Sequence, residues 1–194
     1  MLIDKLEIAG AALVRLERKV DERGFFARTF CAQEFAAAGL TVAVAQTSIS
    51  YNERRGTVRG LHFQWPPSRE DKLVRCLRGE ILDVLLDLRP DSPTYLRHRA
   101  LVLNEENRDA VFIPYGVAHG FQALADRTEV LYQMTDFFAG DLNAGVRWND
   151  PAFGIRWPLP VSVISERDAA CADFERVAFE SELARHAGRR GPDA

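Results

Sequence analysis

Short apolar stretches recur over the first two thirds of the chain, and Gly, Pro, Asn and Asp separate most of them. Several can alternate apolar and polar positions, which is the period of a half-buried strand. The stretches that we predict to be strands are 11–17, 25–30, 41–50, 58–64, 73–77, 81–88, 99–103, 110–113, 119–124 and 129–135. Short strands at this spacing, with turn residues between them, are typical of a β-sandwich or β-barrel.

Helical signals are few. Residues 33–38 form a short helical stretch that Gly39 ends, and residues 166–183 favour helix. A doubly wound parallel sheet needs long helices between its strands, so the sequence disfavours this class. We expect one all-β domain over residues 1–185, a β-barrel or jelly roll with a small helical cap, and a disordered tail over 186–194.

Two local features predict how neighbouring strands connect. Arg78-Gly79-Glu80 lies between two apolar stretches and predicts a tight hairpin. Lys72 precedes an apolar strand that we expect to pair beside the strand at 58–64.

The composition excludes several classes of protein. A chain of 194 residues with 47% hydrophobic and 27% charged residues resembles an average soluble domain. Its net charge of −3 and the lack of a basic tract disfavour a nucleic-acid partner, and no stretch reaches the ~20 apolar residues of a membrane span. The N-terminus is charged where a signal peptide is apolar, and the three cysteines form no CxxC pair. We therefore expect a cytoplasmic protein with reduced thiols and no membrane partner.

Two histidines lie in segments that suit a binding site. In Arg59-Gly60-Leu61-His62-Phe63-Gln64, regular strand geometry places His62 on one face with Gly60 and Gln64, and Arg59 on the opposite face. His119 opens a strand between small residues, which leave room for a ligand. The alternatives are a histidine satisfied in the core or at the surface for His62, and one bonded to a turn backbone for His119. Neither has another histidine two residues away, so we predict no metal site.

Three further side chains could join them. Lys72 begins a strand, Tyr132 lies within an apolar strand, and Asp168 lies at the start of a helix. Their structural alternatives are a solvated charge, a core aromatic ring and an N-terminal helix cap. No nucleophile elbow or phosphate-binding glycine loop is present. An imidazole, a phenol, an ammonium, and the guanidiniums of Arg23 and Arg59 suit acid–base chemistry on an anionic substrate.

Taken in order, these clusters resemble the dTDP-4-dehydrorhamnose 3,5-epimerases, in register from about Ile8 to Asp173. The matching segments are 21–26 (DERGFF), 59–64 (RGLHFQ), 72–76 (KLVRC), 91–95 (DSPTY), 119–121 (HGF), 148–151 (WNDP) and 165–168 (SERD). The resemblance implies a cupin-type jelly roll, a homodimer that exchanges N-terminal strands, and no metal or organic cofactor. It also implies a nucleotide-diphosphate 4-keto-6-deoxyhexose as substrate, epimerised beside its ketone in deoxysugar or surface-polysaccharide synthesis.

The resemblance further implies residue roles. His62 matches the catalytic base, Asp168 its carboxylate partner, Tyr132 the general acid and Lys72 the cation beside the keto oxygen. The matched substrate-binding positions are Arg23, Phe26, Gln46, Arg59 and His119, and Arg23 is expected to reach across the dimer. Family members commonly carry other residues at three further candidate contacts, namely Arg28, Ser48 and Asn143. The first two lie near the family's nucleoside end.

Three alternatives remain open at this point. A C3-only epimerase or a keto-isomerase acting on a related nucleotide sugar would use a similar barrel. A non-catalytic sugar-binding barrel is less favoured, because binding alone does not require Tyr132 opposite His62.

Overall fold

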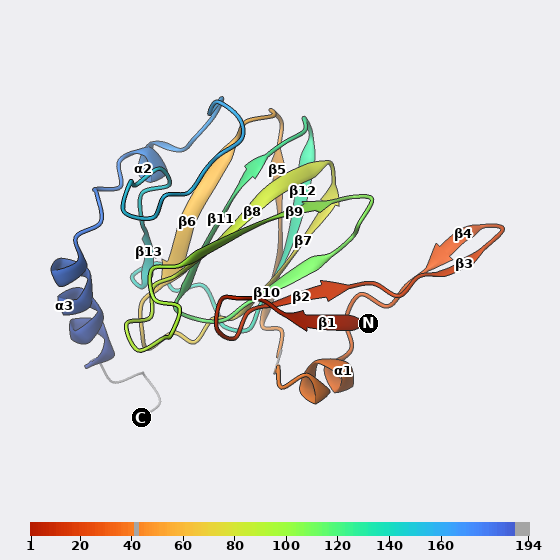
Figure 1. Ribbon diagram of the computed structural model, residues 1–194, viewed down its shortest axis with the longest axis horizontal. Coiled ribbons are helices and arrows are strands. Elements are labelled where there is room, and N and C mark those ends of the chain that lie inside the picture. Colours follow the sequence, from red (N-terminus) through yellow and green to blue (C-terminus); the bar gives the residue numbers. More distant parts are fainter. Residues whose placement is uncertain (41–42, 189–194) are drawn as a thin grey trace.

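Two antiparallel sheets form the body of the computed structural model, which describes residues 1–40 and 43–188 (Figure 1). The six-stranded sheet has the order β1-β2-β10-β7-β12-β5, and the five-stranded sheet has the order β13-β6-β11-β8-β9. Most neighbouring strands come from distant parts of the chain, as in a jelly roll. The predicted all-β jelly roll is confirmed. No helix among the described residues is long and apolar enough to cross a membrane.

The strands of the six-stranded sheet are β1 (Leu2–Lys5), β2 (Ala12–Arg15), β5 (Gln46–Asn52), β7 (Lys72–Arg78), β10 (Ala110–Ile113) and β12 (Thr128–Met134). Those of the five-stranded sheet are β6 (Val58–Gln64), β8 (Glu80–Asp87), β9 (His98–Asn104), β11 (Val117–Ala123) and β13 (Asn143–Gly145). Strands β3 (Lys19–Asp21) and β4 (Gly24–Phe26) pair only with each other and project from the body as a hairpin (Figure 1). Each predicted strand has a counterpart, although residues 41 and 42 of the strand predicted at 41–50 lie outside the described residues. The three-residue strands β3 and β13 are too short to show periodicity.

The chain changes sheets at Gly79. Strand β7 pairs with β10 and β12, whereas β8 pairs with β9 and β11. The hairpin predicted at Arg78-Gly79-Glu80 is therefore wrong, as is the pairing of β7 beside β6. Gly79 has a φ of +74°, and a Cβ there would lie 2.5 Å from Thr128 Oγ1, so this corner needs a glycine.

Three apolar clusters hold these layers together. The cluster between the sheets includes Val74, Leu85 and Phe121, all buried. A second cluster lies between the five-stranded sheet and the C-terminal segment, and a third packs helix α1 (Ala32–Ala37) against the six-stranded sheet. The outer faces of both sheets are thus partly covered by segments from the two ends of the chain.

The C-terminal segment contains two helices, α2 (Glu166–Ala169) and α3 (Arg176–Ala187), where one helical stretch was predicted. The chain between them is extended because Phe174 packs on Phe153, and its N–H donates to Asp150 Oδ2 at 2.5 Å. Helix α3 runs past the predicted domain end at residue 185. His186 is buried and stacks on Trp65 at 5.3 Å between ring centres, which explains why the helix continues. The remainder of the predicted tail, 189–194, lies outside the described residues.

Candidate active site

A cavity of about 380 Å³ between the two sheets gathers most of the predicted site. Eight of the twelve predicted site residues line it, namely Gln46, Ser48, Arg59, His62, Lys72, His119, Tyr132 and Asn143. They come from six strands, three in each sheet. The sandwich thus converts residues spread over about a hundred positions into one polar site.

A β-bulge in β6 places Arg59 and His62 in the same cavity. Opposite them on β11, His119 pairs with His62 and Phe121 pairs with Arg59, so two residues of β6 face one residue of β11. Gly60, with a φ of +108°, makes the bulge possible, because a Cβ there would lie 2.7 Å from the Gly120 Cα. The prediction that Arg59 points to the opposite face from His62 is therefore wrong.

His62 and Asp168 form a hydrogen-bonded pair. His62 Nε2 lies 2.7 Å from Asp168 Oδ1, and the Gly60 N–H donates to Asp168 Oδ2 at 3.1 Å. Burial alone would raise the pKa of Asp168, but the hydrogen bonds from His62 and Gly60 hold that pKa below its usual range. The cap of α2 is Ser165, whose side chain accepts the Asp168 N–H. The capping role considered for Asp168 is thus wrong, and its carboxylate is free to orient His62.

A second histidine–carboxylate pair joins His119, which lines the cavity, to Asp83, which is buried behind it. His119 Nε2 is 2.7 Å from Asp83 Oδ1, and both side chains are buried. The ring of Tyr132 meets the His119 ring edge-on at 5.8 Å. Burial, reinforced by the charge of Asp83, raises the pKa of Tyr132 well above its usual value of 10.0. The phenol is therefore protonated at neutral pH and able to donate a proton.

The two cations of the cavity are each held by a partner. Lys72 Nζ lies 3.0 Å from Glu70 Oε1, which also lines the cavity. Arg59 donates through Nε to the buried Asn52 Oδ1 at 2.7 Å and through Nη2 to the Tyr51 carbonyl at 3.2 Å. Lys72 is thus not the solvated charge considered as its alternative, since its side chain is only 15% exposed. Both groups are placed to meet an anionic or electron-rich ligand.

The polar rim is formed by β5 and β13. Gln46 Oε1 accepts the Phe138 N–H at 2.7 Å, which holds the loop after β12 over the cavity. Ser48 lies exposed on β5, and Asn143 pairs with Gln64 across β13 and β6. All three residues line the cavity.

Three predicted contacts lie elsewhere in the chain. Arg23 is at the tip of the β3–β4 hairpin, where its side chain is 83% exposed and pairs with Asp21. Phe26 and Arg28 line a separate hollow near the base of the hairpin, and Arg28 pairs with Glu34 at 2.8 Å. None of the three lines the cavity of its own chain.

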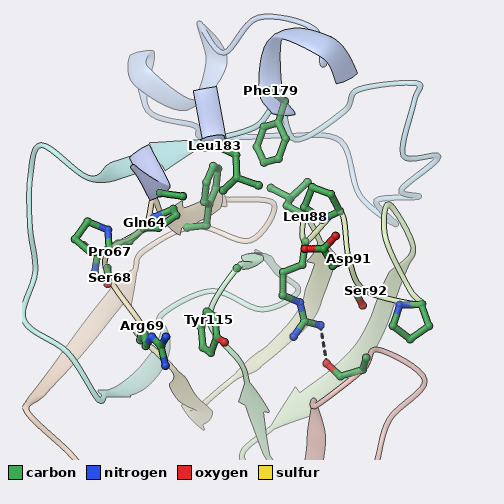
Figure 2. Close-up of a pocket in the computed structure, with 18 residues that line it drawn as sticks. Gln64, Pro67, Ser68, Arg69, Leu88, Asp91, Ser92, Tyr115, Phe179 and Leu183 are labelled. Carbon is green, nitrogen blue, oxygen red and sulfur yellow. Dashed lines mark hydrogen bonds between the residues drawn. The ribbon is translucent and has the colours of Figure 1, made fainter. Parts of the chain in front are cut away.

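A larger cavity, of about 720 Å³, lacks such chemistry (Figure 2). It lies beneath α3, whose Phe179 and Leu183 line it together with several prolines. Its Arg89 is bound to Asp87 and to the Ala9 carbonyl, and no histidine lines it. The paired histidines, phenol and lysine therefore make the smaller cavity the candidate active site.

Residue patterns did not point to Asp83, Glu70 and Asn52. An aspartate between the apolar residues Leu82 and Val84, in the middle of strand Glu80–Asp87, was a usable signal for Asp83, because a buried charge requires a partner. Glu70 and Asn52 gave no comparable signal. No three of the described His, Cys, Asp and Glu side chains gather in a group that could hold a metal.

A family profile, curated proteins and solved structures all match the chain to the same family. The profile of a family described as dTDP-4-dehydrorhamnose 3,5-epimerase matches residues 5–176. The chain is 43% identical to the dTDP-4-dehydrorhamnose 3,5-epimerase of Methanothermobacter thermautotrophicus over 84% of this chain and 89% of that protein. Two crystal structures are also similar to it over most of their length.

The first is the dTDP-4-dehydrorhamnose 3,5-epimerase of Bacillus anthracis with TDP and PPi bound. It is 34% identical, with a TM-score of 0.86 over 89% of this chain and 99% of that one. The second is the dTDP-6-deoxy-D-glucose-3,5-epimerase of Legionella pneumophila in complex with dTDP-4-keto-L-rhamnose. It is 32% identical, with a TM-score of 0.85 over 94% of this chain and 96% of that one.

Proposed function

The chain belongs to the dTDP-4-dehydrorhamnose 3,5-epimerases, and from this premise we propose how its residues divide the reaction. The protein is an isomerase of deoxysugar biosynthesis that inverts C3 and C5, the carbons beside the ketone of a dTDP-linked 4-keto-6-deoxyhexose. One observation carries the assignment of roles. A histidine oriented by a carboxylate, a protonated phenol and a lysine line a single cavity.

His62 is the base. Its Nε2 is held by Asp168, so Nδ1 is the ring nitrogen left to take the proton from the carbon beside the ketone. Imidazole has an ordinary pKa of about 6.5, which suits a base near neutral pH. The Asp168 carboxylate stabilises the imidazolium that forms, and its bond from Gly60 keeps it in place.

Lys72 and Tyr132 complete the proton transfer. When the C–H bond breaks, its electron pair moves into an enolate whose oxygen is stabilised by the Lys72 ammonium. Inversion then requires a proton from the opposite face, which Tyr132 donates through its hydroxyl group. Its place in the cavity that also contains His62 supports the role, and a phenol holds its proton at neutral pH. Arg59, which lines the same cavity, binds the diphosphate.

Isotope exchange tests this assignment. The enzyme incubated with dTDP-4-keto-6-deoxyglucose in D₂O should incorporate deuterium at C3 and C5, and His62→Ala should abolish the incorporation. His98→Ala, on an edge strand outside the cavity, is the matched control and should exchange normally. Exchange at C3 alone would indicate a mono-epimerase, and movement of the carbonyl a keto-isomerase. Binding without exchange would indicate a sugar-binding barrel.

We also propose that the protein acts as a homodimer in which the β3–β4 hairpin reaches the cavity of the partner. Strands β1 and β2 join their own sheet, whereas the hairpin pairs with no other strand of the described residues and leaves Phe26 72% exposed. Arg23, Phe26 and Arg28 lie on or beside this hairpin, away from their own cavity.

Subunit complementation tests the exchange. A mixture of inactive Arg23→Ala and His62→Ala chains should regain about a quarter of wild-type activity after refolding together, because half of the sites in mixed dimers are intact. A hairpin that acts within its own chain would give no recovery.

We further propose that the protein works in the cytoplasm. Cys31, Cys76 and Cys171, all the cysteines of the chain, are free thiols. Free thiols are typical of reducing compartments, where disulfides are rare. Detection of the protein in a cytosolic fraction would test the assignment.

A further inference from the structure

The mechanism above leaves one charged side chain of the cavity unused. Glu70 Oε1 lies 3.0 Å from Lys72 Nζ, and the two side chains are only 8% and 15% exposed. Both line the cavity that contains His62 and Tyr132. A carboxylate in this position weakens the field of the ammonium, which by itself makes Lys72 a poorer stabiliser of an enolate. The effect of Glu70 on the charge of Lys72 therefore does not explain why the two side chains are paired.

The loop that carries Glu70 is firmly held. The Glu70 N–H donates to Ser68 Oγ at 3.3 Å, and Ser68 Oγ donates to Asp136 Oδ2 at 3.0 Å. On the other side, the Asp71 N–H donates to Thr135 Oγ1 at 2.8 Å. Hydrogen bonds on both sides of Glu70 thus connect the loop to the end of β12. The carboxylate occupies a defined place at the cavity wall.

A lysine side chain is not held in one position by its own structure. Its four-carbon stem has large rotamer freedom, and its ammonium has three N–H donors. The ion pair with Glu70 holds the ammonium from one side and leaves its other side for the cavity. Resting on the proposed function, we propose that Glu70 is a positioning residue that holds Lys72 Nζ where the substrate ketone binds. The gain in orientation then outweighs the weakened charge.

Kinetics of two variants test the proposal. Glu70→Gln keeps an acceptor oxygen for Lys72, whereas Glu70→Ala removes it. Glu70→Ala should lower kcat about 10- to 100-fold with KM changed less than about threefold, and Glu70→Gln should keep at least about a third of kcat. Glu106→Ala, at an exposed position outside the cavity, is the control. Normal kcat in Glu70→Ala, or equal losses in both variants, would overturn the positioning role.

A double variant adds a second condition. If Glu70 acts through Lys72, then Glu70→Ala combined with Lys72→Ala should be no slower than Lys72→Ala alone. A further loss in the double variant would show that Glu70 acts independently and would overturn the proposal.

An experiment without substrate separates this proposal from the proposed function. The chain has three lysines, and Lys5 and Lys19 are exposed, so they provide internal references for trace acetylation followed by peptide mass spectrometry. Labelling of Lys72 relative to Lys5 should rise at least about threefold in Glu70→Ala and stay unchanged in Glu70→Gln, since only the first frees the ammonium. An unchanged ratio in Glu70→Ala would overturn the positioning role. A raised ratio in an enzyme without isotope exchange would refute the proposed function and leave the positioning intact.

Discussion

Replacing Asp168 with asparagine removes the negative charge of the His62–Asp168 pair and keeps the size and shape of the side chain. The Gly60 N–H, which now donates to Asp168 Oδ2, would keep the amide oxygen of the new side chain. The amide NH₂ would then face His62 Nε2, 2.7 Å from the present carboxylate oxygen. Because an NH₂ group only donates, Nε2 would have to accept and the ring proton would move to Nδ1. The base would lose both its counter-charge and the lone pair that it uses.

The magnitude follows from the geometry of the pair. Two unit charges about 4 Å apart interact by about 1 kcal/mol in water and about 4 kcal/mol at an effective dielectric constant of 20. His62 is 38% exposed, so solvent screening reduces the upper value to about 2–3 kcal/mol. At 1.36 kcal/mol for each factor of ten, loss of the charge alone slows the reaction about 30- to 150-fold. The changed tautomer adds to this, so we expect at least a hundredfold loss, in round numbers about 10²–10⁴.

Deuterium incorporation at C3 and C5, followed by proton NMR, measures this loss directly. Asp173→Asn is the matched control, because Asp173 lies five residues further along and its side chain is 70% exposed. The control should exchange at the wild-type rate. If Asp168→Asn exchanges within about threefold of wild type while remaining folded, the carboxylate has no part in the reaction and the reasoning fails.

Three further predictions concern other groups. Tyr132→Phe should leave some proton washout but lose most inversion, about 10²–10⁴-fold, in a comparison of deuterium uptake with product formation; full epimerisation would refute its role. The Cys76 thiol, whose pKa burial raises to about 12, should resist iodoacetamide at pH 8 while the partly exposed Cys31 reacts, as peptide mass spectrometry would show; rapid labelling of Cys76 would contradict its burial. Burial acts to raise the pKa of Asp87, but bonds from Arg89, Ser92 and Thr94 lower it below 3.8. Its contribution to stability is therefore complete above pH 3.8 and lost as the pH falls through the lowered pKa, so Asp87→Asn should flatten the acid decline in urea unfolding; an unchanged decline would contradict this.

The strands of this fold were predictable because their signal is local. Residues 58–64 and 110–113 are strands with the predicted bounds, since their apolar positions report burial directly. Which sheet each strand joins was not predictable in the same way. The partners of β7 lie about 35 and 55 residues further along the chain. The apolar stretches on either side of Gly79 do not indicate which strands these partners are.

The same contrast between local signals and long-range contacts applies to the site residues. His62, His119, Tyr132 and Lys72 were predicted by residue type and by resemblance, and all line one cavity. Their partners were harder to predict, because Asp83 meets His119 across 36 positions and only the folded sheets bring them together. Arg59 was placed on the wrong face because one extra residue in β6 reverses the alternation that a regular strand would have.

The extra residue of the β6 bulge brings the substrate-binding Arg59 and the base His62 into one cavity. On a regular strand Arg59 and His62 would point in opposite directions, so substrate binding and proton removal would take place on different sides of the sheet. The bulge is accommodated because Gly60 and Gly120 approach each other with no room for a side chain. Any larger residue at either position would push the two strands apart. Arg59, which binds the diphosphate, and His62, which is the base, would then both be displaced. Altered substrate range should therefore be sought by changing cavity residues on β5, such as the exposed Ser48, and the paired glycines should be left as they are.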